Sequence, residues 1–272
     1  MGLLVISDLD GTLLDHDTYE FSEALPALDR LKRVQAPLVL CSSKTRAEMI
    51  PLWQELGLDA PLIAENGGGV FAPASSPLAL GAGWEEVSPK WRMRRLGLNI
   101  GQVRQRFARF KDRFEARGFG DLSDQEVSSL TGLPLAQAAA ARSREFNEPV
   151  VLPQPEEQEA EFRKAANDQG LTLTQGGRFF HLLSGADKGR ATKLVIDLYR
   201  AQDPELTTMG LGDSPNDLPM LSVVDDPVLV AHPDGTHAKM ELAGLRLQPQ
   251  PGPRGWNQAV LTKIKEVYPE DA

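Results

Sequence analysis

The 272-residue sequence contains little cysteine and histidine: Cys41 is its single cysteine, and there are four histidines. One cysteine cannot form a disulfide within the chain, and so few sulfur and imidazole ligands argue against a closed zinc site. No apolar run approaches the roughly 20 residues that a membrane-spanning helix needs. The first residues turn acidic too soon for a signal peptide, so we expect a cytoplasmic protein with no membrane partner.

Basic residues are outnumbered, because 29 Lys and Arg against 38 Asp and Glu give a net charge of −9. Binding to a nucleic-acid backbone needs a basic surface, so we expect no nucleic-acid partner. Apolar residues make up 41% of the chain and charged residues 25%, which is typical of a soluble globular enzyme. None of these features predicts an oligomeric state.

The two ends of the chain alternate between short apolar runs and helical patterns. Apolar runs that stop abruptly at polar residues predict buried parallel strands at 3–7, 37–41, 62–64, 207–211 and 227–230. Helices are predicted at 46–56, 188–200, 215–221 and 256–268, and Pro51 should kink the first of them or delay its start. This alternation predicts a Rossmann-like α/β core with a parallel sheet and right-handed crossovers.

The middle of the chain follows a different pattern. Val103, Phe107, Phe110 and Phe114 recur at the spacing of one buried face of a long helix. Further helices are predicted after the capping box at 123–126 and at 134–142 and 156–169, and a hairpin at 171–183 turns on Gly176-Gly177. We therefore predict an inserted α+β cap domain at 83–184, between core segments 1–82 and 185–272.

The run Asp8-Leu9-Asp10-Gly11-Thr12 directly follows the first predicted strand. Two carboxylates separated by one residue can approach the same phosphate. Asp8 can then attack phosphorus and form an aspartyl-phosphate, while Asp10 handles the proton of the leaving group. Taken alone, the run also fits a plain Asp-Gly turn. An EF-hand is excluded, because Thr12, Leu13 and Tyr19 stand where that calcium loop needs an acid or amide, a glycine and a glutamate.

A second acidic run, Gly210-Leu211-Gly212-Asp213-Ser214-Pro215-Asn216-Asp217, follows a later strand. Functional groups of open parallel sheets gather at the carboxyl ends of the strands, so this run should face Asp8. Mg²⁺ prefers oxygen ligands, which Asp8, the Asp10 carbonyl and Asp213 can supply, with Asp217 as a water-bridged or supporting partner. We therefore expect Mg²⁺ as the cofactor, although this run alone also fits a loop with a proline-initiated helix.

Two further residues can complete a phosphate site. Ser42, or less favourably Ser43, follows the second strand, where a hydroxyl and loop amides can bind a phosphoryl oxygen. Lys188 at a predicted helix start can neutralise the phosphate and the nucleophile. Each has a plainer interpretation, since a serine after a strand often caps a helix and a lysine at a helix start is often solvated.

In their order along the chain, these motifs resemble the haloacid dehalogenase superfamily: an Asp-x-Asp-x-Thr loop at Asp8, then Ser42, Lys188 and the late acids Asp213 and Asp217. The resemblance implies a core domain with the larger, C2-type cap. An acid at position 10 is similar to the phosphatases and mutases of that superfamily, whereas its transport ATPases have threonine there.

Other segments resemble the mannosyl-3-phosphoglycerate phosphatase family nearly from end to end. They are Cys41-Ser42-Ser43-Lys44-Thr45, Glu65-Asn66-Gly67, Arg142-Ser143-Arg144-Glu145-Phe146 and Gly177-Arg178-Phe179-Phe180-His181. That family releases mannosylglycerate and phosphate, which implies a small phosphorylated sugar-glycerate as the substrate. The residues implied to contact it are Ser43, Glu65, Asn66, Gly67, Arg142, Arg144, Arg178, His181 and Asn216.

Alternatives stay open at this point. Arg142 and Arg144 also fit the end of a helix, where the dipole favours cations, and His181 fits an ordinary strand position. Related activities are a glucosyl-3-phosphoglycerate phosphatase, another sugar-phosphate phosphatase or a phosphomannomutase. A non-catalytic sugar-phosphate binding protein is the alternative from another class, and the intact acids Asp8 and Asp10 count against it.

The nucleophile assignment is directly testable. Asp8→Asn should abolish Mg²⁺-dependent phosphate release, because an amide cannot form the aspartyl-phosphate. Phosphate release and circular dichroism of the purified variant check both the activity and the fold. Substantial turnover by a folded variant would remove Asp8 from this role.

Overall fold

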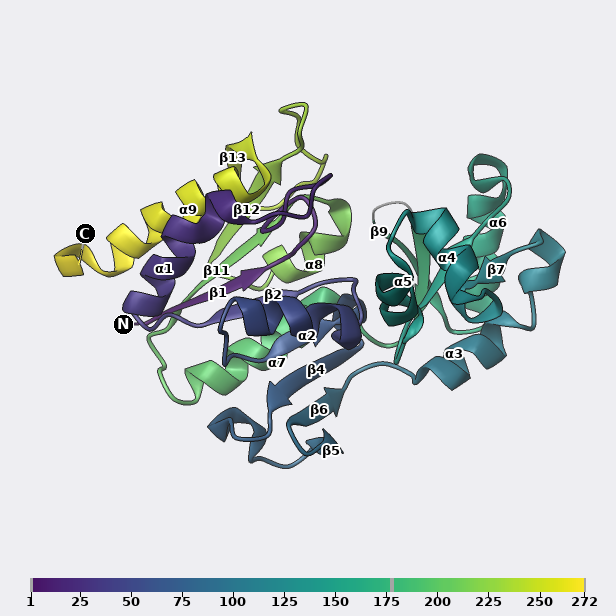
Figure 1. The fold of residues 1–272 in the computed structure, drawn as a ribbon, viewed down its shortest axis with the longest axis horizontal. Coiled ribbons are helices and arrows are strands. Elements are labelled where there is room, and N and C mark those ends of the chain that lie inside the picture. The colour runs from purple at the N-terminus through teal and green to yellow at the C-terminus, as the bar shows by residue number, and fades with distance from the viewer. Residues whose placement is uncertain (1, 177–178, 272) are drawn as a thin grey trace.

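The structure, a computed structural model, describes residues 2–176 and 179–271. Figure 1 shows two lobes, a larger α/β core that carries both chain ends and a smaller cap formed by the middle of the chain. Within the described residues, no helix is long and apolar enough to cross a bilayer. The predicted α/β core with an inserted α+β cap is therefore the observed arrangement.

The core is built on a nine-stranded sheet in the order β13-β12-β11-β1-β2-β3-β4-β6-β5. The strands from β13 to β3 are parallel, whereas β4, β6 and β5 continue the sheet in antiparallel pairing. The strands are β1 (Leu3–Ser7), β2 (Leu38–Cys41), β3 (Leu62–Ala64), β4 (Gly69–Pro73), β5 (Glu85–Ser88), β6 (Trp91–Arg95), β11 (Thr207–Gly212), β12 (Asp226–Ala231) and β13 (Arg246–Pro251).

Helices cover both faces of this sheet, which explains why the central parallel strands are apolar throughout. The helices are α1 (Leu25–Arg33), α2 (Arg46–Glu55), α7 (Lys188–Arg200), α8 (Leu218–Leu221) and α9 (Gly252–Val267). Alternate residues of β1 face opposite layers: Leu3 and Val5 pack with α1, α2 and α9, whereas Leu4 and Ile6 pack with α7 and α8. Figure 1 shows α1 and α9 side by side.

Helix α2 begins at Arg46, as its sequence pattern predicts. Thr45 accepts a hydrogen bond from the Glu48 N–H, and the Glu48 side chain accepts one from the Thr45 N–H. This capping box fixes the start of the helix. The later start considered because of Pro51 is therefore wrong, and Pro51 lies inside a helix that continues to Glu55.

Within the described residues, the cap combines a four-stranded antiparallel sheet with α-helices and short 3₁₀ helices. Its strand order is β7-β8-β10-β9. The elements are α3 (Ile100–Phe107), β7 (Arg117–Gly118), α4 (Asp124–Thr131), α5 (Leu135–Arg142), β8 (Glu148–Val151), α6 (Pro155–Asp168), β9 (Thr172–Gly176) and β10 (Phe179–Leu183). One sheet face packs on α3 and α6, and Phe119 and Phe179 pack with α4 and α5 on the other.

The phenylalanine spacing in the cap predicts the buried face but overestimates the helix. Helix α3 ends at Phe107, and a short 3₁₀ helix at Lys111–Phe114 follows. Phe110 and Phe114 still pack in the same cluster as Val103 and Phe107, around Phe162 of α6. The periodicity therefore identifies core residues correctly even where the chain leaves the α-helical path.

The start of the insert differs from the predicted boundary at residue 83. Strands β5 and β6 pair with the core sheet through β4 and so belong to the core by their hydrogen bonds. Segment 83–95 is half exposed and polar, so its strand pattern is weak in the sequence. We propose that the cap begins after Arg95, and the return to the core near residue 184 stays a prediction.

A tight turn after β3 supports the N-terminus of α7. Gly67 has φ +88, and a Cβ atom there would lie 2.1 Å from the Asp187 carbonyl oxygen. Asp187 caps α7 by accepting the Arg190 N–H at 2.8 Å. Only glycine allows both the left-handed conformation and this close backbone approach, so the turn fixes the point at which Lys188 enters the core.

Gly67→Ala should therefore lower the free energy of unfolding by about 2–4 kcal/mol, which combines left-handed strain with steric overlap. Gly244→Ala is a matched control, because Gly244 has φ +77 but a Cβ atom there would meet no other atom within 4 Å. It should cost about 1 kcal/mol from backbone strain alone. Urea denaturation of both variants measures the difference, and equal costs would contradict the packing role of Gly67.

Candidate active site

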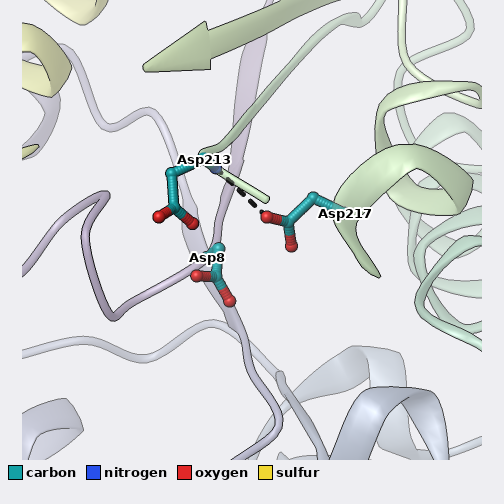
Figure 2. A group of neighbouring side chains, drawn as sticks. All are labelled: Asp8, Asp213 and Asp217. Carbon is teal, nitrogen blue, oxygen red and sulfur yellow. Dashed lines mark hydrogen bonds between the residues drawn. The ribbon is translucent and has the colours of Figure 1, made fainter. Parts of the chain in front are cut away.

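The site lies where two neighbouring parallel strands end. Asp8 follows β1 and Asp213 follows β11, and the Asp8 N–H donates to the Leu211 carbonyl at 2.9 Å. Carboxylate oxygens of Asp8, Asp213 and Asp217 all lie within 4.8 Å of one another. Figure 2 shows the three side chains next to one another, with the Asp217 carboxylate hydrogen-bonded to the Asp213 N–H. The expected meeting of the two acidic runs is thus the observed geometry.

Lys188 links two of these carboxylates. Its Nζ donates to Asp8 Oδ1 and to Asp217 Oδ1, each at 2.6 Å, and the residue is 1% exposed. The second oxygen of Asp217 accepts the N–H groups of Asp213 and Ser214, each at 3.1 Å. Because both of its oxygens bind protein donors, Asp217 orients Lys188 and the Asp213 loop, which agrees with a supporting rather than a direct metal role.

The cluster carries more negative than positive charge, and this perturbs its titration. Burial, reinforced by Asp217, raises the pKa of Asp8 well above its usual value despite the opposing effect of Lys188. Burial and Asp217 raise the pKa of Asp213 to about 6. Burial disfavours the charged form of Lys188, but Asp217 and Asp8 outweigh it and raise the Lys188 pKa.

These groups fit a hard divalent cation. Asp8 and Asp213 present neighbouring carboxylates, and the Asp10 carbonyl is the third candidate ligand named from the sequence. Mg²⁺ takes this kind of oxygen donor, usually with few carboxylates and with waters and phosphate oxygens completing its shell. A bound cation would also relieve the repulsion that raises the pKa values of both acids.

Asp10 lies beside this cluster at the edge of the open space. Its Oδ2 is 3.0 Å from Lys44 Nζ, and its other oxygen, Oδ1, is buried without a hydrogen-bond partner among the described residues. Gly11, with φ +74, brings the loop against the second acidic run, since a Cβ there would lie 2.5 Å from Asp213 Oδ2. The glycine therefore lets the Asp8 and Asp213 loops meet.

The two serines after β2 have different surroundings. Ser42 is buried, and its Oγ accepts the Lys44 N–H at 3.2 Å. Ser43 lines the cavity described below, and its carbonyl accepts a hydrogen bond from Arg144 Nη1 at 2.8 Å. The choice between them as the phosphate-binding hydroxyl stays a prediction, with Ser42 as the first candidate.

A cavity of about 490 Å³ separates the core loops from the cap. The core contributes mainly polar and charged side chains, and the cap contributes aromatic and aliphatic ones as well as two basic residues. The lining residues are Asp10, His16, Asp17, Tyr19, Ser43, Lys44, Glu48, Phe119, Thr131, Gly132, Leu133, Ala141, Arg144, Pro149, Phe179 and His181. The volume suits a small phosphorylated molecule held between the two lobes.

The basic cap residues named from the sequence separate into two groups. Arg144 and His181 line the cavity, and Asn147 Oδ1 lies 3.2 Å from Arg144 Nη1 and 3.4 Å from His181 Nδ1. Arg142 instead pairs with Asp124 and is not among the cavity-lining residues, so its predicted substrate contact is not what this geometry offers. Arg178 lies outside the described residues.

The Glu65–Gly67 turn holds the cap to the core instead of lining the cavity. The Glu65 carboxylate accepts the N–H groups of Glu145, Phe146 and Asn147 at 2.7, 2.9 and 2.8 Å. Burial raises the Glu65 pKa, although Arg144 and these N–H groups oppose the shift. We name this set, with the Arg144 to Ser43 hydrogen bond, the core–cap contact. Glu65 thus makes a structural contact here, and direct substrate binding by the turn stays a prediction.

Two other residues named as substrate contacts lie outside the cavity lining. Asn66 is buried, with both polar atoms of its side-chain amide unpaired within the described structure, and its N–H donates to the Ser42 carbonyl at 3.0 Å. Asn216 lies in the second acidic run, where its Oδ1 accepts the Ser214 hydroxyl at 2.5 Å. Both therefore support loops that carry site residues.

Sequence reasoning missed three residues that the structure brings to the site. Lys44 pairs with Asp10, and its Nζ lies 5.0 Å from the centroid of the Tyr19 ring. His232 Nε2 lies 3.0 Å from the Asp213 carbonyl oxygen. The signal for Lys44 was its place in the same loop as Ser42, whereas no local pattern marks Tyr19 or His232.

Comparison with known proteins gives concordant results. A family model for haloacid dehalogenase-like hydrolases matches residues 5–77. Glucosyl-3-phosphoglycerate/mannosyl-3-phosphoglycerate phosphatases of Persephonella marina and Methanococcoides burtonii are 36% and 39% identical to this chain. The first alignment covers 97% of this chain and 98% of the relative, and the second 96% and 97%. A solved structure from Thermoplasma acidophilum aligns with a TM-score of 0.69 at 19% identity, over 96% of this chain and 98% of its own.

With relatives this similar over nearly its whole length, the chain belongs to the haloacid dehalogenase-like hydrolases. Within that family it is a phosphoric monoester hydrolase, and the two phosphatases it resembles mark it as a sugar-phosphate phosphatase. Both levels of the resemblance seen in the sequence are confirmed. The Thermoplasma structure supports the fold alone.

Because Asp213 is a buried acid with a raised pKa, replacing it with a neutral residue should stabilise the folded protein. The Asp213 pKa rises from 3.8 in the unfolded chain to about 6 in the folded protein, so this carboxyl favours folding below pH 3.8 and loses that contribution as the pH rises through 6. In a chelator, Asp213→Asn should therefore raise the free energy of unfolding at pH 7 by about 1–3 kcal/mol and change it little at pH 4.

Asp226→Asn is the matched control with the opposite sign. Burial opposes the ionisation of Asp226, but Arg246 and Lys263 outweigh burial and lower its pKa, so neutralising it should destabilise the protein at pH 7. Urea denaturation of both variants in chelator provides the measurement. If Asp213→Asn instead lowered the free energy of unfolding at pH 7, the ionised Asp213 carboxylate would not destabilise the folded protein, and the prediction would be wrong.

Proposed function

We propose that this phosphatase hydrolyses mannosyl-3-phosphoglycerate to mannosylglycerate and phosphate, with Asp8 as the nucleophile and Mg²⁺ as the cofactor. The observation that most supports this proposal is the position of Asp8. Its buried carboxylate binds Lys188 at 2.6 Å and lies next to Asp213, and Asp8 is on the same loop as the cavity residue Asp10. The two phosphatases at 36% and 39% identity support the substrate class.

In the first step, a carboxylate oxygen of Asp8 bonds to phosphorus while the bond between phosphorus and the glycerate ester oxygen breaks. Asp10 gives its proton to that oxygen, so mannosylglycerate leaves as a neutral alcohol at this position. In the second step Asp10 takes a proton from water, and the water oxygen attacks phosphorus and releases Asp8 and inorganic phosphate. Asp10 is thereby reset for the next cycle.

Lys188 and the loop after β2, which carries Ser42 and Ser43, stabilise negative charge on the phosphoryl group during both steps. The ammonium of Lys188 favours the ionised form of Asp8 and orients its carboxylate. It also neutralises negative charge that gathers between the nucleophile and the phosphate. Asp217 holds Lys188 in place through a second ion pair at 2.6 Å. The Ser42 hydroxyl and nearby loop amides are the candidates for binding the phosphoryl oxygens.

The cation site fits this chemistry. Asp8, Asp213 and the Asp10 carbonyl would hold Mg²⁺, which when bound supplies positive charge that orients the phosphate and offsets its repulsion from the carboxylates. The cap contributes by enclosing the cavity, because Arg144 and the Glu65 carboxylate join it to the core. Exclusion of bulk water strengthens the electrostatic interactions inside.

Glucosyl-3-phosphoglycerate is the second candidate substrate. The names of both relatives carry the glucosyl and the mannosyl compound, so this observation favours two sugars rather than one. The two substrates share the phosphate, the ester oxygen and the carboxylate, and they differ in the hexose that the cap would contact. The mechanism at Asp8 is the same for both.

A substrate panel tests this function. Purified protein with Mg²⁺ should release inorganic phosphate from mannosyl-3-phosphoglycerate with a kcat/KM at least tenfold above that for mannose 6-phosphate or glucose 6-phosphate. Chelation should abolish the release, and added Mg²⁺ should restore it. Formation of an isomeric phosphosugar without free phosphate would indicate a mutase, and binding without turnover would contradict the enzyme.

A further inference from the structure

Lys44 occupies a distinctive position at the junction of the catalytic loop and the cavity. It follows β2, lines the cavity, and its Nζ lies 3.0 Å from Asp10 Oδ2. The Tyr19 ring lies against the ammonium, with 5.0 Å between Nζ and the ring centroid. Its side chain is only 21% exposed, so its charge faces the cavity in a largely desolvated setting.

In the proposed mechanism Asp10 protonates the ester oxygen, whereas Lys44 has no role. Lysine has three N–H donors, and one directed to Asp10 leaves two others for an anion in the cavity. A molecule bound in the cavity could therefore contact the Asp10 carboxyl group with one atom and the Lys44 ammonium with a neighbouring one.

The other strong cation of the described lining is committed to the protein. Arg144 donates to the carbonyls of Ser43 and Ala141 and to Asn147 Oδ1, and its side chain is 5% exposed. The bond to Ser43 belongs to the core–cap contact, and the three bonds together hold the guanidinium in place. Lys44 is thus the basic side chain best placed to meet an anionic group beside Asp10.

The chemistry of a 3-phosphoglycerate ester supplies such a group. Its carboxyl carbon is separated by two carbon–carbon bonds from the carbon that bears the phosphate ester oxygen. When that oxygen lies beside Asp10, the carboxylate must lie close by as well. A cation within hydrogen-bond distance of Asp10 is therefore where this carboxylate would find its partner.

We propose that Lys44 binds the substrate carboxylate and thereby selects phosphate esters of glyceric acid over esters that lack an acid group. This inference rests on the proposed function and names the residue that determines its substrate class. By contacting Asp10 and the carboxylate together, Lys44 also holds the ester oxygen next to its proton donor. The low exposure of the site strengthens the pairing relative to water.

The test compares two substrates on the same enzyme preparation. One is mannosyl-3-phosphoglycerate, and the other is its analogue in which a CH₂OH group replaces the carboxylate. Lys44→Met should lower kcat/KM for the carboxylate substrate about 10- to 100-fold more than for the alcohol analogue, as expected for a lost charge-assisted hydrogen bond. The ratio of the two values is independent of the fraction of folded protein.

Two further variants sharpen the result. Lys44→Arg keeps the positive charge and should retain most of the preference for the carboxylate substrate. Lys193→Met is the control, because Lys193 also pairs with an aspartate, Asp197, at 2.8 Å but is 64% exposed on α7. It should leave both substrates and their ratio unchanged.

The possible outcomes separate this inference from the function itself. If the wild-type protein does not hydrolyse mannosyl-3-phosphoglycerate, the proposed function fails. If it does, but Lys44→Met slows both substrates by the same factor or neither, Lys44 only orients Asp10 or does nothing, and the inference is overturned. A wild-type enzyme without preference between the two substrates would overturn it as well.

Discussion

The buried ammonium of Lys188 between Asp8 and Asp217 is the interaction on which the site depends. Three carboxylates gather out of water at the carboxyl ends of β1 and β11, and the positive charge of Lys188 opposes the rise in the pKa values of Asp8 and Asp213. The position of Lys188 is set by the close contact between Gly67 and the start of α7. The placement of the nucleophile Asp8 therefore depends on a turn in a different part of the chain. The remaining excess of negative charge favours a divalent cation.

The cap is joined to this site by a small number of specific contacts. Glu65 accepts three consecutive backbone N–H groups, and Arg144 donates to the Ser43 carbonyl next to the phosphate-binding candidate Ser42. The same segment of the cap also carries Asn147, which contacts the cavity residue His181. The cap residues that line the cavity and the core loop that follows β2 are therefore joined by direct contacts.

The sequence predicts the central strands and the acidic site because both follow from local rules. Apolar runs such as 3–7 are buried on both faces, and adjacent parallel strands bring their ends together, so Asp8 and Asp213 had to be neighbours. β5 and β13 escape such reasoning because they are polar and half exposed, and their pairing depends on the neighbouring strand. The contact between Glu65 and the backbone of residues 145–147 could not be predicted, because these partners lie about 80 residues away and carry no signal in the neighbourhood of Glu65.

The placement of Glu65 also limits how the two lobes can move. The peptide chain crosses between them twice, and these crossings run together where the Leu98 N–H donates to the Ser184 carbonyl at 3.2 Å. Two linking segments held side by side in this way act as one hinge and permit the cap to rotate relative to the core. The Glu65 carboxylate adds an attachment beside that hinge, because the Gly68 carbonyl accepts the Leu96 and Gly97 N–H groups. A swing of the cap that separated residues 145–147 from the core would therefore have to release three backbone N–H groups from a buried acid. Where release of product needs such a swing, this opening step would limit turnover independently of the phosphoryl chemistry.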